Sequence, residues 1–297
     1  LRRLCSHYSR TILVIMISRV STTIGYLCTM STKIAIIGGG NIGVALAKGL
    51  VNSGKYKTND IAITRRRTSK LDEMAFEGYR VSSDNSVVVE NSKVVVLAIL
   101  PQQLDSVLAE VKDQITPEHL IVSVVSGVTI ADIKSVIGDQ APIVRAMPNT
   151  AISIGESMTC ISANGGSKDR IPEVVEMFKT VGETMIINED QMTSATSLCA
   201  CGIAFFLRAI RAASQGGTEI DFHASEALKM AAQTAKGAAA LLLEHDSHPE
   251  DEIDKVTSPK GCTIAGLNQM EHHGFSSAFI KGITTSAEKA GGLYTND

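Results

Sequence analysis

The chain has 297 residues, of which 44% are hydrophobic and 20% charged, and its 28 basic and 31 acidic residues leave a net charge of −3. This near balance disfavours nucleic acid as the main partner, because proteins that bind polyanions carry a basic excess. The apolar fraction disfavours a disordered chain, six Cys in a chain of this length do not indicate a disulfide scaffold, and the size predicts about two domains.

The first thirty residues are basic, rich in Ser and free of acidic side chains. Their longest apolar run, Ile12–Ile17, has six residues, whereas a membrane span needs ~20. A transit peptide fits this composition. We favour an extension upstream of a start at Met30, because a complete strand begins directly after Ser31. Residues 31–297 are then expected to form a soluble cytoplasmic protein.

From residue 31 onward, short apolar runs alternate with segments of helical length. The expected strands are Lys33–Ile37, Ile61–Ile63, Val94–Ala98, Leu120–Ser123, Ile143–Met147 and Glu183–Asn188. The expected helices are Asn41–Asn52, Pro101–Lys112, Ile130–Ile137 and Ser167–Thr180. This alternation indicates an α/β domain, with a parallel sheet covered on both faces, over residues 31–188.

After residue 188 the composition changes. Gln191–Gln215, Phe222–Glu244 and Thr263–Ala290 are rich in Ala, Leu and Met and carry few strand signals, which predicts an all-helical domain over residues 189–297. Gln233–Leu243 has Ala, Gly or Leu at nearly every position. It is either the central helix of one subunit or part of a contact between subunits. We favour the contact, because a small helical domain has few interior positions.

The motif GGGNIG begins at Gly38, directly after an expected strand, and opens an expected helix. It fits the pattern G-x-G-x-x-G. In that pattern Gly38 makes a tight turn, Gly40 lets the backbone approach a pyrophosphate, and Gly43 lets helix and strand pack closely. The phosphates would lie at the positive helix end, where Asn41 and Ile42 follow. A plain glycine-rich turn is the alternative, and the strand–turn–helix context favours a dinucleotide site.

The second strand of such a domain usually ends in an acid that binds the ribose hydroxyls of NAD, about 20 residues after the glycines. This chain has Thr64-Arg65-Arg66-Arg67 there. An acid repels a 2′-phosphate, whereas Arg binds it through several donors. We therefore expect NADPH as the cofactor, with NADH possible, and contacts from Thr64, Arg65 and Arg66. A solvated basic loop is the alternative.

A second motif, DKVTSPKGCTIAGL, runs from Asp254 to Leu267. Its Ser, Pro and Gly form a turn that leads straight into an apolar helix. Backbone N–H groups and hydroxyls at a helix start suit a small carboxylate, although an ordinary capped helix start fits equally well. Cys199, Cys201 and Cys262 do not have the spacing of a metal or redox pair, so we expect buried thiols and no metal site.

Three stretches together resemble the pyrroline-5-carboxylate reductase family. They are Ile36–Gly43, Arg145–Thr150 with Gly155-Glu156, and the motif from Asp254, whose form D-x-V-T-S-P-x-G-x-T-I is the most specific. The resemblance covers about Thr32 to Ala290. It implies a Rossmann domain followed by a helical dimerisation domain, NAD(P)H-dependent reduction of 1-pyrroline-5-carboxylate to L-proline, and a dimer or a higher oligomer of dimers.

The resemblance also implies roles for single residues. Ser258 and the backbone of Gly261 and Cys262 would bind the substrate carboxylate, and the Thr263 hydroxyl would meet the imine nitrogen. Ser258 and Thr263 are therefore the expected catalytic residues. The motifs contain no acid–base pair. A cyclic imine can take its proton from solvent, so the expected work of the enzyme is orientation.

The resemblance also implies roles for Asn149 and Asp246, and the chain departs from the family pattern at three places. Asn149 would lie near the nicotinamide and Asp246 beside the substrate. The chain has Cys199–Ala204 where relatives usually have S-G-x-G-P-A, Lys260 in place of a glycine, and Leu100 where a Lys is common. These departures bear on the shape of the pocket more than on the class of reaction.

Two other functions remain open at this point. One is a reductase of the same architecture that acts on another small imine or on a 3-hydroxy acid. The hydroxy-acid version needs a Lys as acid–base in the helical domain, and Lys236 is the candidate, in a helix expected to be buried. The other is a non-catalytic NADP(H)-binding regulatory dimer, in which the loop from Ser258 to Thr263 binds no imino acid.

Overall fold

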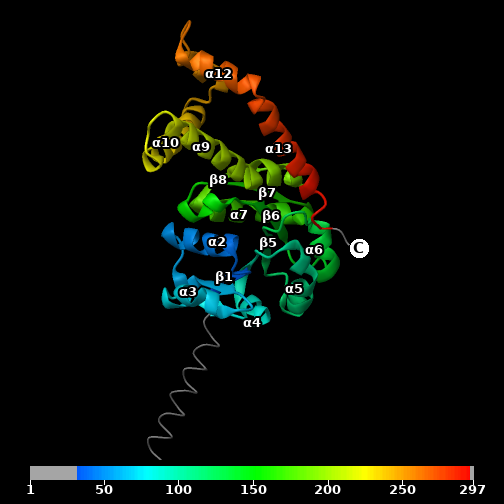
Figure 1. Ribbon diagram of the computed structural model, residues 1–297. Coiled ribbons are helices and arrows are strands. Elements are labelled where there is room, and N and C mark those ends of the chain that lie inside the picture. The colour runs from blue at the N-terminus through cyan, green and yellow to red at the C-terminus, as the bar shows by residue number, and fades with distance from the viewer. Residues whose placement is uncertain (1–31, 295–297) are drawn as a thin grey trace, which may run out of the picture.

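The computed structural model describes residues 32–294, so both interpretations of residues 1–30 lie outside the described part. An eight-stranded sheet flanked by helices carries a set of longer helices on one side (Figure 1). The strand order is β3-β2-β1-β4-β5-β6-β7-β8, parallel throughout except between β6 and β7. The strands are β1 Thr32–Ile37, β2 Ile61–Thr64, β3 Arg80–Ser82, β4 Ser92–Leu97, β5 Leu120–Ser123, β6 Ile143–Met147, β7 Ser157–Ala163 and β8 Gly182–Ile186.

Helices cover both faces of the sheet, because its strands are apolar on both sides. On β1, Ile34 and Ile36 join one core cluster, while Ala35 and Ile37 join another. Helices α2, α3 and α7 pack on the first face and α4, α5 and α6 on the second. Their bounds are α2 Asn41–Asn52, α3 Asp72–Phe76, α4 Asn85–Glu90, α5 Leu104–Val111, α6 Ile130–Ile137 and α7 Ile171–Phe178. The predicted α/β domain is confirmed.

Strand β7 is absent from the prediction because half of its buried residues are polar. Ser157, Thr159 and Ser162 are almost fully buried. Their hydroxyls find partners inside the protein: the Ser157 and Thr159 oxygens lie 3.2 Å apart, and Ser157 also accepts a bond from the backbone N–H of Asn149. Internal hydrogen bonds therefore let a polar segment form an inner strand.

The second part of the chain is helical, as predicted. It starts with α8 (Met192–Ala195), the π-helical turn η9 (Thr196–Cys201) and α9 (Gly202–Glu219), and continues with α10 (Ala224–His245), α11 (Pro249–Lys255), α12 (Cys262–His272) and α13 (Phe275–Ala290). Helix α10 packs on α9, and α13 returns to α8 and η9. The helical run 189–219 is long and apolar enough to cross a membrane, by length and composition only.

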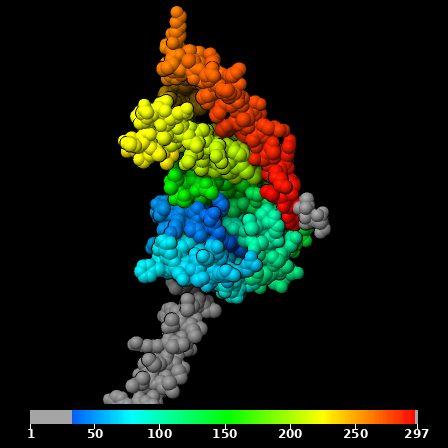
Figure 2. Space-filling view, viewed as in Figure 1, coloured from blue at the N-terminus to red at the C-terminus, as the bar shows by residue number. Residues whose placement is uncertain are grey.

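The apolar segment of α10 is not the central helix of this chain. Most of Gln233–Leu243 is exposed, and Leu243 is 86% exposed. Lys236 is exposed as well, which corrects the expectation that it lies in a buried helix. The last residues of the described chain fold back onto the α/β domain, where the Tyr294 hydroxyl donates to Asp105 at 2.8 Å. Figure 2 shows the helical part projecting from the α/β part, with α12 at its far end.

Candidate active site

The glycine loop after β1 has the geometry that its sequence predicts. Gly38 has a φ of +113°, and a Cβ there would collide with the carbonyl oxygen of Ala98. A Cβ at Gly43 would collide with the carbonyl oxygen of Gly38. At Gly40, by contrast, a Cβ would meet nothing within 4 Å. Gly38 and Gly43 are therefore required by close backbone contacts, whereas Gly40 leaves open space beside the start of a helix.

That helix start fits a pyrophosphate. Gly40 is the N-cap of α2, and no side chain caps the helix. The first N–H groups of α2, which include those of Asn41 and Ile42, therefore point into the open space beside Gly40. Such a helix start attracts negative charge. The loop is held from both sides: the N–H of Gly39 donates to the Thr64 carbonyl, and Arg65 Nη1 donates to the Gly39 carbonyl, each at 2.6 Å.

The three residues predicted to contact the cofactor at the end of β2 have different surroundings. Thr64 is 2% exposed, and its hydroxyl donates to Asn85 Oδ1 at 2.6 Å. The Thr64 side chain therefore holds α4 on the sheet, and a cofactor contact from Thr64 stays a prediction. Arg65 is exposed and clamps the glycine loop. Arg66 is exposed and makes no ion pair within residues 32–294, so its guanidinium is free to bind a phosphate.

Asn149 and Leu100 lie at the same edge of the sheet as the glycine loop, because each follows the end of a strand parallel to β1. Asn149 is buried; its Oδ1 accepts from the N–H of Ala151 at 3.0 Å, and its Nδ2 donates to the carbonyl of Cys199 at 3.3 Å. Asn149 thus joins the two domains. Leu100 is 64% exposed and offers an apolar side chain at this edge.

The second loop also leads into an uncapped helix. Gly261 is the N-cap of α12 without a side-chain cap, and its N–H donates to the Ser258 carbonyl at 2.9 Å. A Cβ on Gly261 would lie 2.5 Å from Ser258 Oγ and 2.9 Å from the Ser258 carbonyl oxygen, so any other residue would have to displace this turn. In the described part of the chain the Ser258 and Thr263 hydroxyls make no hydrogen bond, and the N–H of Cys262 opens the helix. These free donors suit a carboxylate. Cys262 is exposed, which corrects the expectation of a buried thiol.

Two residues near this loop have left-handed backbone conformations. Lys260 has a φ of +58°, which costs a non-glycine residue about 1–2 kcal/mol, so the backbone at this position favours glycine. Asp246 has a φ of +49° at the end of α10 and is exposed. The turn after Asp246 is held by Glu252, which accepts from Lys255 and Ser247, each at 2.7 Å. These hydrogen bonds, that of Lys255 first, hold the pKa of Glu252 at about 2.

One chain does not bring the two halves of the predicted site together. The glycine loop lies on the sheet, whereas the loop that contains Thr263 lies at the far end of the helical part (Figure 1). Helix α12 packs mainly on α13. Hydride transfer needs donor and acceptor atoms within about 3–3.5 Å. Gly40 and Thr263 of a single chain therefore cannot serve one cofactor–substrate pair in this arrangement.

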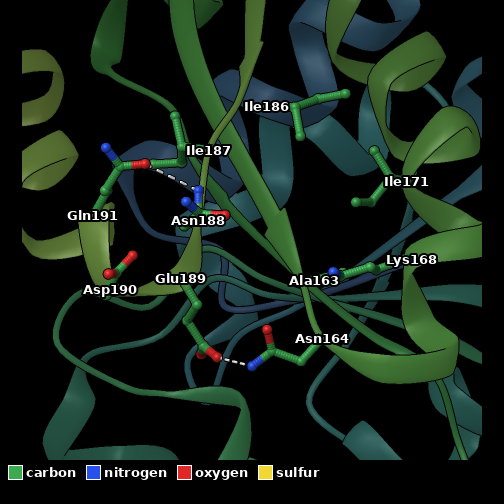
Figure 3. Close-up of a pocket in the computed structure, with 10 residues that line it drawn as sticks. All are labelled: Ala163, Asn164, Lys168, Ile171, Ile186, Ile187, Asn188, Glu189, Asp190 and Gln191. Atoms are coloured by element: carbon green, nitrogen blue, oxygen red, sulfur yellow. Dashed lines mark hydrogen bonds between the residues drawn. The ribbon is translucent and has the colours of Figure 1, made fainter.

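A hollow of about 590 Å³ lies elsewhere, between the ends of β7 and β8 (Figure 3). In register, Ala163 at the end of β7 lies beside Val144 at the start of β6, so the hollow is at the edge opposite to the glycine loop. Dinucleotides bind such sheets at the carboxyl ends of the parallel strands that include β1, which is the edge with the glycine loop and not the edge with this hollow. Glu189 lines the hollow and binds Asn164 and the buried Arg145, the latter at 3.3 Å. No residue predicted for the site lines it.

Two features of this region have no counterpart in the sequence motifs. Arg145 and Glu189 form an ion pair where the helical part begins, and burial lowers the pKa of the guanidinium while Glu189 opposes that shift. Cys160 on β7 lies against Cys199. Neither pair is close in sequence, so no local pattern could reveal them. Within residues 32–294 no group of three or more His, Cys, Asp or Glu side chains is arranged to hold a metal.

The chain is similar in sequence to known protein families and to individual proteins. A family model described as pyrroline-5-carboxylate reductase dimerisation matches residues 189–293, and one described as NADP oxidoreductase coenzyme F420-dependent matches residues 33–127. Pyrroline-5-carboxylate reductase 1 of Dictyostelium discoideum is 53% identical over 274 residues, which cover 88% of this chain and 50% of that protein. Pyrroline-5-carboxylate reductase 2 of the same organism is 49% identical, covering 87% and 92%. The chain thus spans half the length of the first relative and nearly all of the second.

Solved structures agree with these relationships. The fold is similar to that of a Plasmodium falciparum pyrroline carboxylate reductase with NADP bound, with a TM-score of 0.80 at 24% identity over 90% of this chain and 99% of that one. A pyrroline-5-carboxylate reductase from Coxiella burnetii has a TM-score of 0.80 at 31% identity, covering 90% of this chain and all of the other. On the sequence identity, the shared fold and the two matching family models, this chain belongs to the pyrroline-5-carboxylate reductase family.

Proposed function

We propose that this chain reduces 1-pyrroline-5-carboxylate to L-proline with NADPH as the preferred cofactor and NADH as a possible one. The observation that carries the proposal is the loop from Ser258 to Thr263, which joins two free hydroxyls to an uncapped helix start. The hydroxyls and the free N–H groups of the helix start can donate hydrogen bonds to a small anionic substrate. The chain also belongs to a family whose named members act on such a substrate.

The residues of the chain bind and orient the reactants. The Ser258 hydroxyl, the N–H of Cys262 and the backbone of Gly261, whose own N–H donates to the Ser258 carbonyl, hold the substrate carboxylate. The Thr263 hydroxyl forms a hydrogen bond with the imine nitrogen, which takes its proton from solvent. When bound, NADPH supplies the hydride. The glycine loop and Asn149 hold the cofactor so that its nicotinamide faces the imine carbon, and this positioning accounts for most of the rate enhancement.

The cofactor preference is proposed from the end of β2. Arg66 is exposed, and no acid occupies the position that would bind the ribose hydroxyls of NAD. Arg65 is bound to the glycine loop, so it serves the loop and is also near a phosphate placed there. Both features favour a 2′-phosphate.

We further propose that each active site is built from two chains, with the glycine loop from one and the Ser258–Thr263 loop from its partner. The separation of these loops in one chain supports this arrangement. An exposed apolar surface on α9 and α13 supports it as well, because such a surface needs a cover in water. Its aromatic members pack against one another: Phe205, Phe206, Phe275 and Phe279.

A second copy also accounts for the apolar helical run 189–219, which lies within the matched dimerisation region. We therefore propose a dimer, alone or as a unit of a higher oligomer, that inserts into no membrane. The net charge of −3 supports the absence of a nucleic-acid partner. A cytoplasmic location is part of the same proposal.

The test is NADPH oxidation by the purified protein with 1-pyrroline-5-carboxylate, with proline identified as the product. Thr263→Ala should lower turnover by up to about 100-fold, the low end for loss of one positioned donor, and leave the KM for NADPH unchanged. Thr263→Ser is the matched control and should recover much of the loss, because it restores the hydroxyl. No imine-dependent oxidation would leave a non-catalytic NADP(H)-binding dimer, and a fully active Thr263→Ala would show that the hydroxyl does not align the imine.

A further inference from the structure

Two cysteines that the mechanism does not use meet at the junction of the two domains. Cys160 lies on β7 and Cys199 lies in the π-helical turn η9, and their Sγ atoms are 3.8 Å apart. Cys160 belongs to a small core cluster that contains Met147 and Met192, and Cys199 packs against that cluster. The pair therefore bridges the sheet and the π-helical turn η9 of the helical part.

The pair also lies beside a residue of the proposed site. Cys160 is the register partner of Met147, the last residue of β6. Asn149 follows two residues later, and its Nδ2 donates to the backbone carbonyl of Cys199 at 3.3 Å. A displacement of Cys199 therefore acts directly on Asn149, which we place on the nicotinamide side of the cofactor.

The two thiols are not equivalent. Cys160 is 3% exposed, whereas Cys199 is partly open to solvent. The hydrogen bond between the two thiols lowers the pKa of Cys199 to about 7 and, together with burial, raises the pKa of Cys160. The thiolate thus forms on Cys199, which solvent reaches. Cys160 stays protonated beside it. A reactive thiol next to a second one is the arrangement of a redox-sensing pair.

We propose that Cys199 and Cys160 form a peroxide-responsive pair that closes to a disulfide across the domain junction and slows the enzyme. The Cys199 thiolate attacks one oxygen of hydrogen peroxide, the O–O bond breaks, and the hydroxide released takes a proton to become water. Cys199 is then a sulfenic acid. The Cys160 sulfur attacks it, the S–S bond forms, and a second water leaves with the Cys160 proton. Two thiols are oxidised and one peroxide is reduced to two waters.

Closure must bring the two sulfur atoms closer together. The sulfur–sulfur separation has to fall from 3.8 Å to the ~2.05 Å of a disulfide. A π-helical turn is a local departure from α-helical geometry and is often found at functional sites. Movement of η9 towards β7 carries with it the carbonyl that holds Asn149, so we expect a lower turnover in the oxidised enzyme. That effect on activity rests on the proposed function, whereas the formation of the disulfide does not.

The experiment treats the full-length protein with hydrogen peroxide, blocks free thiols by alkylation, and maps linked tryptic peptides by mass spectrometry without reduction. We expect the peptide that contains Cys160 to be linked to the peptide that contains Cys199. Because Cys201 lies on the same tryptic peptide, the variant Cys201→Ser is the matched control and should still form the link. Cys199→Ser should abolish it.

Activity is measured on the same samples, each relative to its own untreated protein. Peroxide should lower the turnover of the parent and of Cys201→Ser several-fold, and dithiothreitol should restore it. Cys199→Ser and Cys160→Ser should keep their activity, although they retain the exposed Cys262. Failure to detect the linked peptide in folded protein overturns the proposal. Equal loss of activity in Cys199→Ser overturns the regulatory part, because the loss then arises at another thiol.

Discussion

Replacing Gly40 by Ala tests the cofactor site with little disturbance of the fold. A Cβ at this position would meet nothing within 4 Å in the protein itself. The backbone of Gly40 has φ −86° and ψ −168°, which Ala adopts without strain. The space that the new methyl group enters is the space in which we place the pyrophosphate. Gly40→Ala should therefore fold normally and bind NADPH poorly.

The expected magnitudes differ for folding and for binding. Ala is a poorer N-cap than Gly, but it also loses less freedom on folding, so the free energy of unfolding should change by less than about 1 kcal/mol. A methyl group that holds the phosphates away from the helix start removes one or more hydrogen bonds to charged oxygens, each about 1.5–3 kcal/mol. The loss of one such bond corresponds to roughly 10- to 100-fold in affinity.

The assay pairs urea unfolding with titration of NADPH. Gly166→Ala is the matched control, because its Cβ also meets nothing within 4 Å while the residue is remote from the glycine loop. It should change neither stability nor cofactor affinity. Gly43→Ala should unfold more easily, since its Cβ collides with the Gly38 carbonyl. A Gly40→Ala protein that binds NADPH as tightly as the parent would refute the placement of the pyrophosphate.

The remaining predictions concern cofactor choice, stability and pH. Arg66→Ala should raise the KM for NADPH at least about tenfold and leave the KM for NADH unchanged. Arg65→Ala should raise both KM values, because Arg65 also binds the glycine loop. An equal effect of Arg66→Ala on the two cofactors would contradict this assignment. Glu189→Ala should lower the free energy of unfolding by about 3 kcal/mol, because it leaves the buried Arg145 without its carboxylate, and a loss well below 1 kcal/mol in urea unfolding would be inconsistent with that role. The rate at which peroxide oxidises Cys199 should rise with pH as its thiolate forms and level off above about 7, whereas a continued rise through pH 9.0 would indicate an ordinary thiol.

The sequence predicts the regular elements of this fold well where an apolar pattern marks them. Helix α2 and strands β5 and β6 have the predicted bounds, because short apolar runs and turn residues delimit them. Strand β7 was missed, since its buried hydroxyls are satisfied by partners that only the folded chain provides. The π-helical turn η9 has no sequence signal at all, and β3 is too short to stand out.

The candidate site is predictable as two separate motifs and not as one site. The glycine loop and the Ser258–Thr263 loop each have a local pattern with a local physical reason. Their separation in space depends on the packing of α9 to α13, which no local pattern encodes. Thr64 illustrates the same limit, because its burial against Asn85 decides its role and lies outside the motif.

The central claim is that a complete active site combines the glycine loop of one chain with the Thr263 loop of its partner. It is tested by co-expressing Gly40→Ala and Thr263→Ala chains with different tags, purifying the mixed dimer, and measuring NADPH oxidation with 1-pyrroline-5-carboxylate near the parent's KM for NADPH. One of the two sites in the mixed dimer is then intact, so its activity should reach about half that of the parent for a symmetric dimer. A mixed dimer no more active than the two defective homodimers would contradict the account.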